Sequence, residues 1–254
     1  SPTGKYQDGD TAPGDFKYID LNGDGDDKAG IEAALQLKEK CPGSTVTVVS
    51  MGPPQADVAL REALAMGCDD ALLISDRAFG GADTWATSST IAAALKKLDY
   101  DVIITGRQAI DGDTAQVGPQ IAEHLGIPQV SYVEKMDVEG EDTLVVQRQF
   151  EDRHQIIEVK TPCLLTALAE LADPRYMSVH GVFDAYREKE VKVWGLEDIK
   201  DTVNEGNIGL KGSPTRVKKS FTKQAKGAGT ILNDLSDDEA VAAIVEKLQE
   251  KHII

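Results

Sequence analysis

Short apolar runs alternate with longer stretches of helical periodicity through the first half of the chain. Each run is apolar and is bounded by Gly, Pro or Asp, and the run at residues 45–50 is also β-branched, a pattern typical of buried strands. The stretches between them repeat apolar residues at three- and four-residue spacing, which indicates helices packed on one side. The predicted strands cover residues 45–50, 71–75 and 101–105, and the predicted helices cover residues 29–40, 55–66, 84–98 and 114–125.

Strands that alternate with helices predict right-handed crossovers and a parallel sheet covered on both faces. The predicted fold class is therefore α/β, with a doubly wound, mostly parallel sheet. The rhythm then changes, because residues 143–148 and 155–159 flank a polar turn and predict an antiparallel hairpin. Residues 162–168 predict one more buried strand.

The two ends of the chain lack this rhythm. Residues 1–27 are rich in Gly, Asp and Pro and predict an extended or irregular lead-in. Residues 193–235 show little periodicity and predict an extended arm. We therefore divide the chain into an α/β domain of residues 1–192 and a C-terminal arm and helix of residues 193–254.

The last element is a helix with clear start signals. Ser236 is a capping residue and Glu239 follows three positions later, which is the pattern of a capping box. A lone helix at the end of a weakly hydrophobic arm cannot bury an apolar stripe by itself, so we expect it to dock on this domain or on another chain. The stripe consists of Val241, Ile244, Val245 and Leu248.

Three loops leave the predicted strands at the carboxyl edge of the sheet, where doubly wound folds bind ligands. They contain residues 51–53, 76–84 and 106–114. The last two share glycines, which let a backbone approach a ligand, and an Asp-Thr pair at a helix start whose free N–H groups attract phosphate. Asp and Thr are also ordinary capping residues, and that alternative stays open for each loop. Two loops of one design on one edge favour a nucleotide site.

The chemistry of this predicted site has few side-chain candidates. Aspartates aimed at a pyrophosphate would repel it, so Arg77 is the predicted cation and Arg107 a second candidate. Residue spacing yields no paired carboxylates and no Ser-His-Asp arrangement. This favours a bound cofactor over side-chain catalysis.

The charge balance excludes several classes of partner. The chain has 27 Lys and Arg against 43 Asp and Glu, a net charge of −16, which disfavours nucleic acid and anionic membranes. No apolar run approaches the roughly 20 residues of a membrane span, and the opening residues do not form a signal peptide. The three cysteines are scattered and form neither a disulfide framework nor a metal pattern. A cytoplasmic protein without membrane insertion is the simplest interpretation.

Two local patterns keep alternatives open. Residues 20–25 match the first half of a calcium loop, but Ile31 stands at the twelfth position and Glu32 comes one place late, which favours a solvated acidic turn. Residues 206–233 contain no acid and form either a solvated linker or an arm that lies on an acidic partner. The basic residues of this segment are Lys211, Arg216, Lys218, Lys219, Lys223 and Lys226.

Several motifs resemble the β subunits of electron-transfer flavoproteins. The longest is GRQAIDGDTAQVG at residues 106–118, which is similar to the signature loop of that family. The others are ALAMG at 63–67, LADPRY at 171–176 and GSPT at 212–215. The resemblance implies a heterodimer in which the α subunit carries an FAD. The β subunit then supplies an adenine-nucleotide-binding α/β domain, here residues 1–192, and an arm, here residues 193–254, that wraps the α subunit.

Residues 75–88, SDRAFGGADTWATS, resemble the electron-bifurcating branch of this family, which belongs to anaerobic metabolism. In that branch the β subunit holds a second FAD instead of a structural AMP, and this FAD accepts a hydride from NADH. One electron passes to ferredoxin or flavodoxin, and the other passes through the α-subunit FAD to an acyl-CoA-type or other flavin dehydrogenase. The small residues Gly80 and Gly81 would leave room for the isoalloxazine ring.

The resemblance also implies functional residues, with neither a catalytic side chain nor a metal among them. Leu171 matches an anchor leucine for the partner dehydrogenase, followed by Pro174, Arg175 and Tyr176, although ordinary packing is an alternative for Leu171. The implied cofactor-binding residues are Met51, Gly52, Asp76, Arg77, Ala78, Gly80, Gly81, Asp83, Thr84, Thr87, Gly106, Gln108, Ala109, Asp111, Gly112, Asp113, Thr114, Gln116, Val117 and Gly118.

One departure and two rival functions accompany the resemblance. The family normally opens with a strand and a nucleotide-binding loop, whereas only residues 16–20 are strand-like before residue 28. One rival is a conventional β subunit that binds AMP and serves an acyl-CoA dehydrogenase without bifurcation. The other is a nucleotide-binding regulatory module without redox work, which the long arm and terminal helix disfavour.

Overall fold

The computed structural model describes residues 3–7 and 15–19 by their backbone, and residues 25–109, 113–215, 227, 229, 231–233 and 235–254 in full. The chain divides into two compact units, Ser1–Arg216 and Val217–Ile254. In the described ranges, no helix is both long enough and apolar enough to cross a bilayer.

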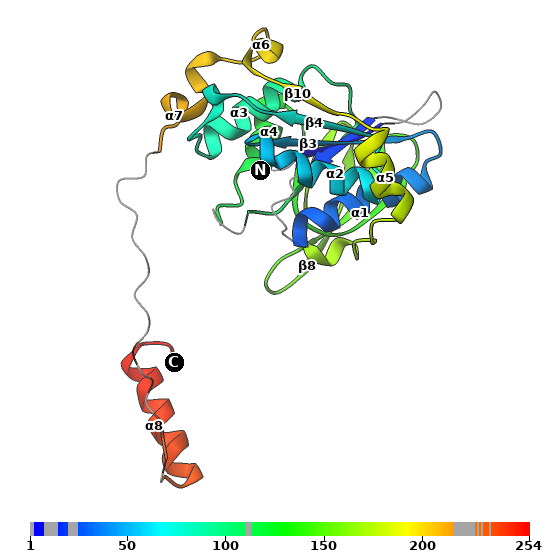
Figure 1. Ribbon diagram of the computed structural model, residues 1–254. Coiled ribbons are helices and arrows are strands. Elements are labelled where there is room, and N and C mark those ends of the chain that lie inside the picture. Colours follow the sequence, from blue (N-terminus) through cyan, green and yellow to red (C-terminus); the bar gives the residue numbers. More distant parts are fainter. Residues whose placement is uncertain are drawn as a thin grey trace. The chain divides into compact units, whose positions relative to one another are not determined.

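The described part of the first unit is built on a ten-stranded mixed sheet with the order β10-β4-β3-β2-β1-β5-β9-β6-β7-β8 (Figure 1). Strands β10, β4, β3 and β2 are parallel to one another, as are β5, β9 and β6. Strand β1 is antiparallel to its neighbours, and β6, β7 and β8 form an antiparallel meander. The strands are β1 Thr3–Gln7, β2 Asp15–Ile19, β3 Thr45–Met51, β4 Asp70–Ile74, β5 Val102–Gly106, β6 Gln129–Glu139, β7 Thr143–Gln149, β8 His154–Lys160, β9 Cys163–Ala167 and β10 Val191–Trp194.

Helices connect these strands and extend the chain beyond them. The α-helices are α1 Gly25–Lys40, α2 Asp57–Met66, α3 Thr84–Leu95, α4 Val117–Leu125, α5 Val179–Arg187, α6 Leu196–Ile199, α7 Gly209–Gly212 and α8 Asp237–Glu250. Short 3-10 turns are η1 Pro54–Ala56, η2 Arg77–Phe79, η3 Ala169–Leu171 and η4 Glu205–Asn207.

Two apolar clusters cover the two faces of the sheet. One cluster contains Ile31 of α1 and Leu60 of α2, and the other contains Ile91 of α3 and Ile121 of α4. Because successive side chains of a strand point to opposite faces, β5 contributes to both clusters. Helices therefore cover both faces, which confirms the predicted doubly wound α/β class.

Most strands of the sheet run in one direction, in agreement with the predicted mostly parallel sheet. The strands predicted at residues 45–50, 71–75 and 101–105 are β3, β4 and β5, and all three run in one direction, as the prediction requires. The predicted hairpin is β7 and β8. Strands β1 and β7 run in the opposite direction, so the sheet is mixed.

The lead-in predicted as extended or irregular at residues 1–27 contains two strands, and the strand-like stretch of residues 16–20 corresponds to β2. Strands β1 and β2 lie between β3 and β5 near the middle of the sheet, and α1 already begins at Gly25. Residues 20–24, which hold most of the calcium-loop pattern, lie outside the described residues. Ile31, at the twelfth position of that pattern, is fully buried in the core.

The first compact unit extends further along the chain than the predicted domain of residues 1–192. Strand β10 pairs in parallel with β4, and Ile199 and Ile208 enter the cluster under α3 and α4. Residues 193–215 therefore pack on the α/β body, and the boundary between units falls at 216/217. Residues 216–226, which hold most of the basic segment, lie outside the described residues.

Helix α8 has the predicted start. Glu239 Oε2 accepts hydrogen bonds from the backbone N–H of Ser236 at 2.9 Å and from its hydroxyl at 2.7 Å. Val241, Ile244 and Val245 of the apolar stripe are exposed within this unit. The predicted amphipathic helix is confirmed, and its apolar face remains without cover among the described residues of the unit.

Candidate functional site

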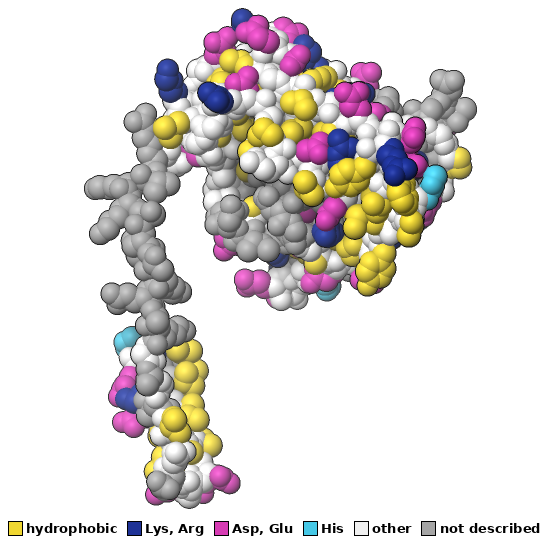
Figure 2. Space-filling view, in the orientation of Figure 1, with side chains coloured by type: hydrophobic (Ala, Val, Ile, Leu, Met, Phe, Trp, Pro, Cys, Tyr) yellow, Lys and Arg dark blue, Asp and Glu magenta, His cyan; other side chains and the backbone are white. Residues whose placement is uncertain are grey.

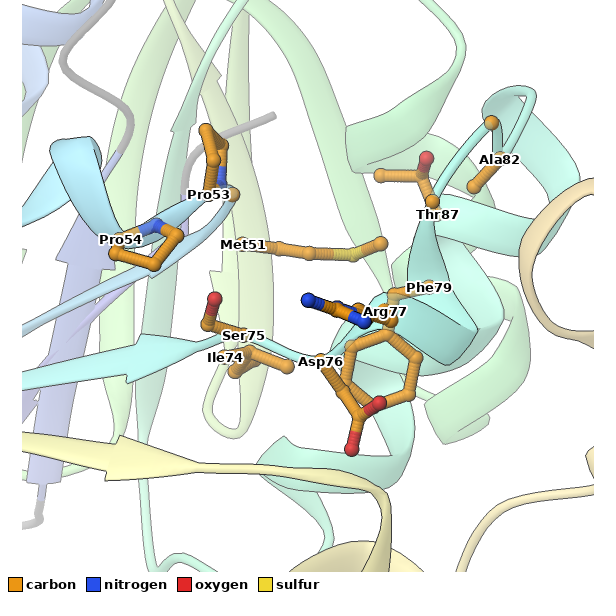
Figure 3. Close-up of a pocket in the computed structure, with 13 residues that line it drawn as sticks. Met51, Pro53, Pro54, Ile74, Ser75, Asp76, Arg77, Phe79, Ala82 and Thr87 are labelled. Carbon is orange, nitrogen blue, oxygen red and sulfur yellow. The ribbon is translucent and has the colours of Figure 1, made fainter.

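A pocket of about 730 Å³ opens beyond the carboxyl ends of β3 and β4 (Figure 3). Ligand pockets usually occupy roughly 300–1,000 Å³ and combine apolar walls with a few polar groups. Here the wall is mainly apolar, and the polar side chains are Ser75, Asp76, Arg77 and Thr87. The lining residues are Met51, Gly52, Pro53, Pro54, Ile74, Ser75, Asp76, Arg77, Phe79, Gly80, Gly81, Ala82 and Thr87.

Arg77 is the basic residue that lines the pocket. It stands at the start of η2, directly after the residue that caps this turn, and Figure 3 shows its guanidinium directed into the space between the lining residues. In the described part of the chain it forms no ion pair, whereas Arg107 Nε lies 3.2 Å from Asp26 Oδ2. Of the two predicted cations, Arg77 is therefore the one available to a bound anion.

Asp76 and Asp83 act as structural caps. The carboxylate of Asp76 accepts hydrogen bonds from the N–H of Ala78 at 2.9 Å and of Leu196 at 3.0 Å. These bonds hold the pKa of Asp76 below its ordinary value. Asp83 caps α3 by accepting from the N–H of Ala86 at 3.0 Å. The capping alternative is confirmed for Asp83, whereas α4 begins at Val117 with Gln116 at the cap position, so Asp113 does not cap it.

Asp83 also connects the end of the first unit to the loop of residues 76–84, called the pocket loop below. Its Oδ2 accepts from Thr215 N at 2.9 Å and Thr215 Oγ1 at 2.6 Å, and its own N–H donates to Ser213 Oγ at 2.8 Å. Burial by itself raises the pKa of Asp83, but the hydrogen bonds from Thr215 and Ala86 outweigh it and the pKa is lowered. The GSPT motif is thus an attachment point for the chain that leads to the second unit.

The glycines of the pocket loop have backbone reasons to be glycine. Gly81 has φ +72°, a left-handed conformation, and a Cβ there would lie 3.2 Å from Leu210 Cβ. Gly209 packs so closely on this loop that a Cβ would lie 2.1 Å from the carbonyl oxygen of Ala78. Leu210 N donates to Gly80 O at 3.0 Å. The pocket loop and residues 209–215 therefore form one packed structure.

The signature loop of residues 106–118 lies beside the pocket loop. Thr84 Oγ1 donates to Gln116 Oε1 at 3.0 Å, which links the two helix starts. Asp113 and Ala115 have φ values of 47° and 52°, an uncommon left-handed backbone for residues other than glycine. Such strain is typical of functional loops.

The structure gathers only part of the predicted cofactor set in this pocket. Seven predicted residues line it: Met51, Gly52, Asp76, Arg77, Gly80, Gly81 and Thr87. Ala78, Asp83 and Thr84 flank it. The predicted residues of the signature loop that the structure describes are absent from its lining, and Asp111 and Gly112 lie outside the described residues. Six further residues line the pocket, and three of them lie in the loops predicted at the ligand-binding edge of the sheet. They are Pro53, Phe79 and Ala82 of those loops, and Pro54, Ile74 and Ser75 beside them.

The four residues predicted to dock a partner have different environments. Leu171 is half-buried and packs against the core cluster that includes α1, in line with the packing alternative. Arg175 forms ion pairs with Glu32 and Glu39. Pro174 is exposed, and Tyr176 is 98% exposed.

Exposed apolar side chains continue this surface along α5. Figure 2 shows hydrophobic side chains gathered at the surface over this helix. Gly181 packs against α2, where a Cβ would lie 2.3 Å from Ala65 O, so the opposite side of α5 faces outward. An exposed apolar patch of this kind is typical of a protein-binding site. Its members are Tyr176, Met177, Val179, Val182, Phe183 and Tyr186.

These features define a class of protein before any comparison. A doubly wound sheet with a pocket beyond the carboxyl ends of its strands is the arrangement of nucleotide-binding α/β proteins. In the described ranges, no group of three or more His, Cys, Asp or Glu side chains is placed to hold a metal ion.

Comparison with known proteins identifies the family. Residues 25–199 match the model of the electron transfer flavoprotein domain. The chain is 61% identical over 229 residues to the electron transfer flavoprotein subunit beta of Clostridium acetobutylicum, across 90% of this chain and 86% of the relative. The chain belongs to the β subunits of the electron transfer flavoproteins.

Two further relatives carry more specific names. The caffeyl-CoA reductase-Etf complex subunit CarD of Acetobacterium woodii is 53% identical over 230 residues. The acryloyl-CoA reductase electron transfer subunit gamma of Anaerotignum propionicum is 50% identical over 235 residues. Each alignment covers 90% of this chain and 86% of the relative.

Proposed function

We propose that this chain is the β subunit of a heterodimeric, electron-bifurcating electron transfer flavoprotein, and that its own nucleotide site holds FAD. The observation that carries the proposal is the pocket at the end of β4, with the guanidinium of Arg77, which forms no ion pair with the described residues, directed into it. Its size and mixed lining fit a nucleotide with an extended aromatic group. When bound, FAD would supply the ability to take up a hydride from NADH and release its electrons singly.

In this proposal the protein residues bind and orient the cofactor. The apolar side chains of Met51, Ile74 and Phe79 would contact a planar ring and exclude water from it. Arg77 would attract the negative charge that the reduced cofactor carries. The N–H groups at the start of α3 and the strained signature loop would hold phosphate and ribose.

We further propose that surfaces outside the cofactor pocket bind protein partners. The two relatives named after caffeyl-CoA and acryloyl-CoA reductases support an acyl-CoA-type dehydrogenase or reductase as one partner. It would dock on the exposed segment around Tyr176 and on the apolar face of α5. The α subunit would be held by residues 217–254, and ferredoxin or flavodoxin would receive the low-potential electron.

Nucleotide analysis of the purified heterodimer tests the cofactor assignment. We expect two FAD and no AMP per heterodimer. One FAD together with one AMP would instead identify a conventional β subunit without bifurcation, and a preparation without flavin would overturn both functions.

Substitution of Arg77 tests the role of its charge. In Arg77→Ala we expect NADH-dependent ferredoxin reduction to fall at least tenfold, because removal of a charge-stabilising group from an active site typically costs about 10²–10³ in rate. Arg77→Lys keeps a positive charge and should retain more activity. Unchanged ferredoxin reduction in Arg77→Ala would remove Arg77 from the mechanism.

A further inference from the structure

Helix α1 holds the segment of residues 169–175 at three points. Near its start, Asp26 Oδ1 accepts a hydrogen bond from Ala169 N at 2.8 Å. In its middle, Leu171 packs against the apolar cluster to which α1 contributes Ile31. Glu32 then binds Arg175. The segment between β9 and α5 is thus fixed along one helix.

The contact between Glu32 and Arg175 is the most highly bonded of the three. Arg175 Nε donates to Glu32 Oε2 at 2.7 Å and Nη2 donates to Oε1 at 2.9 Å, a two-point pairing of guanidinium and carboxylate. The backbone N–H of Arg175 also donates to Oε2, at 3.2 Å, and Gln36 Nε2 donates to Oε1 at 3.1 Å. Glu32 is 4% exposed, so its charge depends on these donors.

Arg175 uses its remaining side to reach a second carboxylate. Its Nη1 donates to Glu39 Oε1 at 2.7 Å, one to two turns further along α1. The arginine therefore lies flat along the helix with three donor groups engaged. A partner that drew the guanidinium away would leave the buried carboxylate of Glu32 unpaired, which is strongly unfavourable.

The residues that follow Arg175 have the opposite character. Tyr176 is 98% exposed and Val179 is 78% exposed, and Ser178 caps α5 by accepting from Gly181 N at 2.9 Å. The chain thus changes from a hydrogen-bonded segment to an exposed one between Arg175 and Tyr176. The orientation of the exposed side chains depends on the backbone at Arg175, whose N–H is bonded to Glu32.

We propose that Glu32 positions the docking segment, which is Tyr176 together with the exposed face of α5. Glu32 acts through Arg175 and does not itself contact the partner dehydrogenase. This inference rests on the proposed docking role of the surface around Tyr176 and α5. In this proposal Arg175 is an internal structural residue and does not contact the partner. Without the Glu32–Arg175 interaction, the exposed residues that follow can adopt many conformations, and binding the partner then costs additional conformational entropy.

The test uses the complete heterodimer and an acyl-CoA dehydrogenase titrated as its partner. For Glu32→Gln we expect the KM for the dehydrogenase to rise about tenfold, equivalent to about 1.4 kcal/mol, with kcat within twofold of the parent. NADH oxidation with a soluble dye as acceptor needs no docking and should also stay within twofold. Arg175→Lys keeps the charge but loses the two-point geometry, and we expect a KM rise of the same sign.

Glu39→Gln is the matched control, because it removes only the exposed carboxylate and should change the KM less than twofold. An unchanged KM in both Glu32→Gln and Arg175→Lys overturns the positioning role of Glu32. A parallel fall in dye-linked activity and dehydrogenase turnover also overturns it, because that pattern is general misfolding. If Glu32→Gln does not fold, Arg175→Lys carries the test.

The docking surface itself is tested separately by Tyr176→Ser and Val179→Ser, which alter exposed side chains. If neither raises the KM, the proposed docking role fails. If both raise it while Glu32→Gln and Arg175→Lys do not, the docking role stands and the positioning role of Glu32 fails.

Discussion

Single aspartates at the helix starts have a larger structural role than the sequence motif suggests. Asp83 was a candidate cofactor ligand, yet its two carboxylate oxygens bind Ala86 N and Thr215. The pattern of Asp followed by Thr predicts capping correctly at Asp83 but not at Asp113, because α4 begins only at Val117. It contains no sign of the partner at Thr215, because that contact joins residues 132 positions apart.

The attachment at Asp83 predicts a local change in hydrogen exchange. In Asp83→Ala we expect faster exchange at the amides of Ala86 and Thr215, and a loss of about 1 kcal/mol in the free energy of unfolding from the missing cap. Thr215→Val removes only the hydroxyl and should leave Ala86 unchanged. Exchange mass spectrometry measures both, and equal protection of Thr215 in Asp83→Ala and the parent would refute the attachment.

The buried carboxylate of Glu32 predicts a pH dependence. Burial raises its pKa, but the hydrogen bonds from Arg175 and Gln36 outweigh burial and the pKa lies below the ordinary glutamate value of 4.5. A lowered pKa means that the ionised group stabilises the fold above about pH 4.5 and that this contribution is lost as the pH falls through the folded-state pKa.

We therefore expect Glu32→Gln to lower the free energy of unfolding by about 1.5 kcal/mol at neutral pH, since it removes the charge from the hydrogen bonds with Arg175, which keeps its ion pair with Glu39. The difference from the parent should shrink as the pH falls below about 4.5. Denaturant unfolding of both proteins at several pH values measures it. A difference that stays constant across that range contradicts the assignment.

At the scale of elements, the strands and helices with continuous apolar patterns were predictable. Strands β3, β4 and β5 read directly from their apolar runs, because both of their faces are buried. Strand β6 was missed, since its two buried pairs do not alternate and a register shift lies between Val130 and Val133. Helix α5 was missed because much of its apolar surface is exposed, so its apolar spacing does not mark a core.

The close packing of α4 on the sheet predicts the effect of a small substitution. A Cβ on Gly118 would lie 2.6 Å from Thr105 Oγ1 and 2.9 Å from Thr166 Cγ2, both β-branched side chains of strands. Gly118→Ala should therefore push α4 away from β5 and β9 and destabilise the fold by about 1–3 kcal/mol. Thermal unfolding gives the size of the effect. A more stable variant would show that the helix has room to shift.

At the scale of the molecule, the two compact units differ in how far they bury their apolar side chains. The first unit buries two clusters of its own. The second ends in α8, whose apolar stripe is not covered by the described residues of that unit. The sequence predicted this stripe from periodicity, and the family resemblance supplied its proposed partner. Periodicity alone does not identify that partner, because it marks the face to be covered and not the surface that would cover it.

The stripe on α8 predicts which face assembles with the α subunit. Ile244→Asp places a charge on the stripe and should lower the affinity of the two subunits for each other at least tenfold, about 1.4 kcal/mol. The dissociation constant of the heterodimer measures the effect. Ala243→Asp adds the same charge on the other side of the helix and serves as the control. Equal affinity of both variants for the α subunit would exclude the stripe as the contact.

The attachment of Thr215 to Asp83 has a thermodynamic consequence for assembly. One aspartate belongs both to the helix start beside the proposed cofactor site and to the origin of the segment that we propose to hold the α subunit. If each ligand orders this shared aspartate, their binding free energies are coupled, and coupling is reciprocal by linkage. The α subunit should then tighten cofactor retention by the same factor by which the cofactor tightens subunit association. The heterodimer with bound cofactor can then form whichever of the two binds first, and dissociated β subunits should lose their nucleotide faster than the heterodimer does.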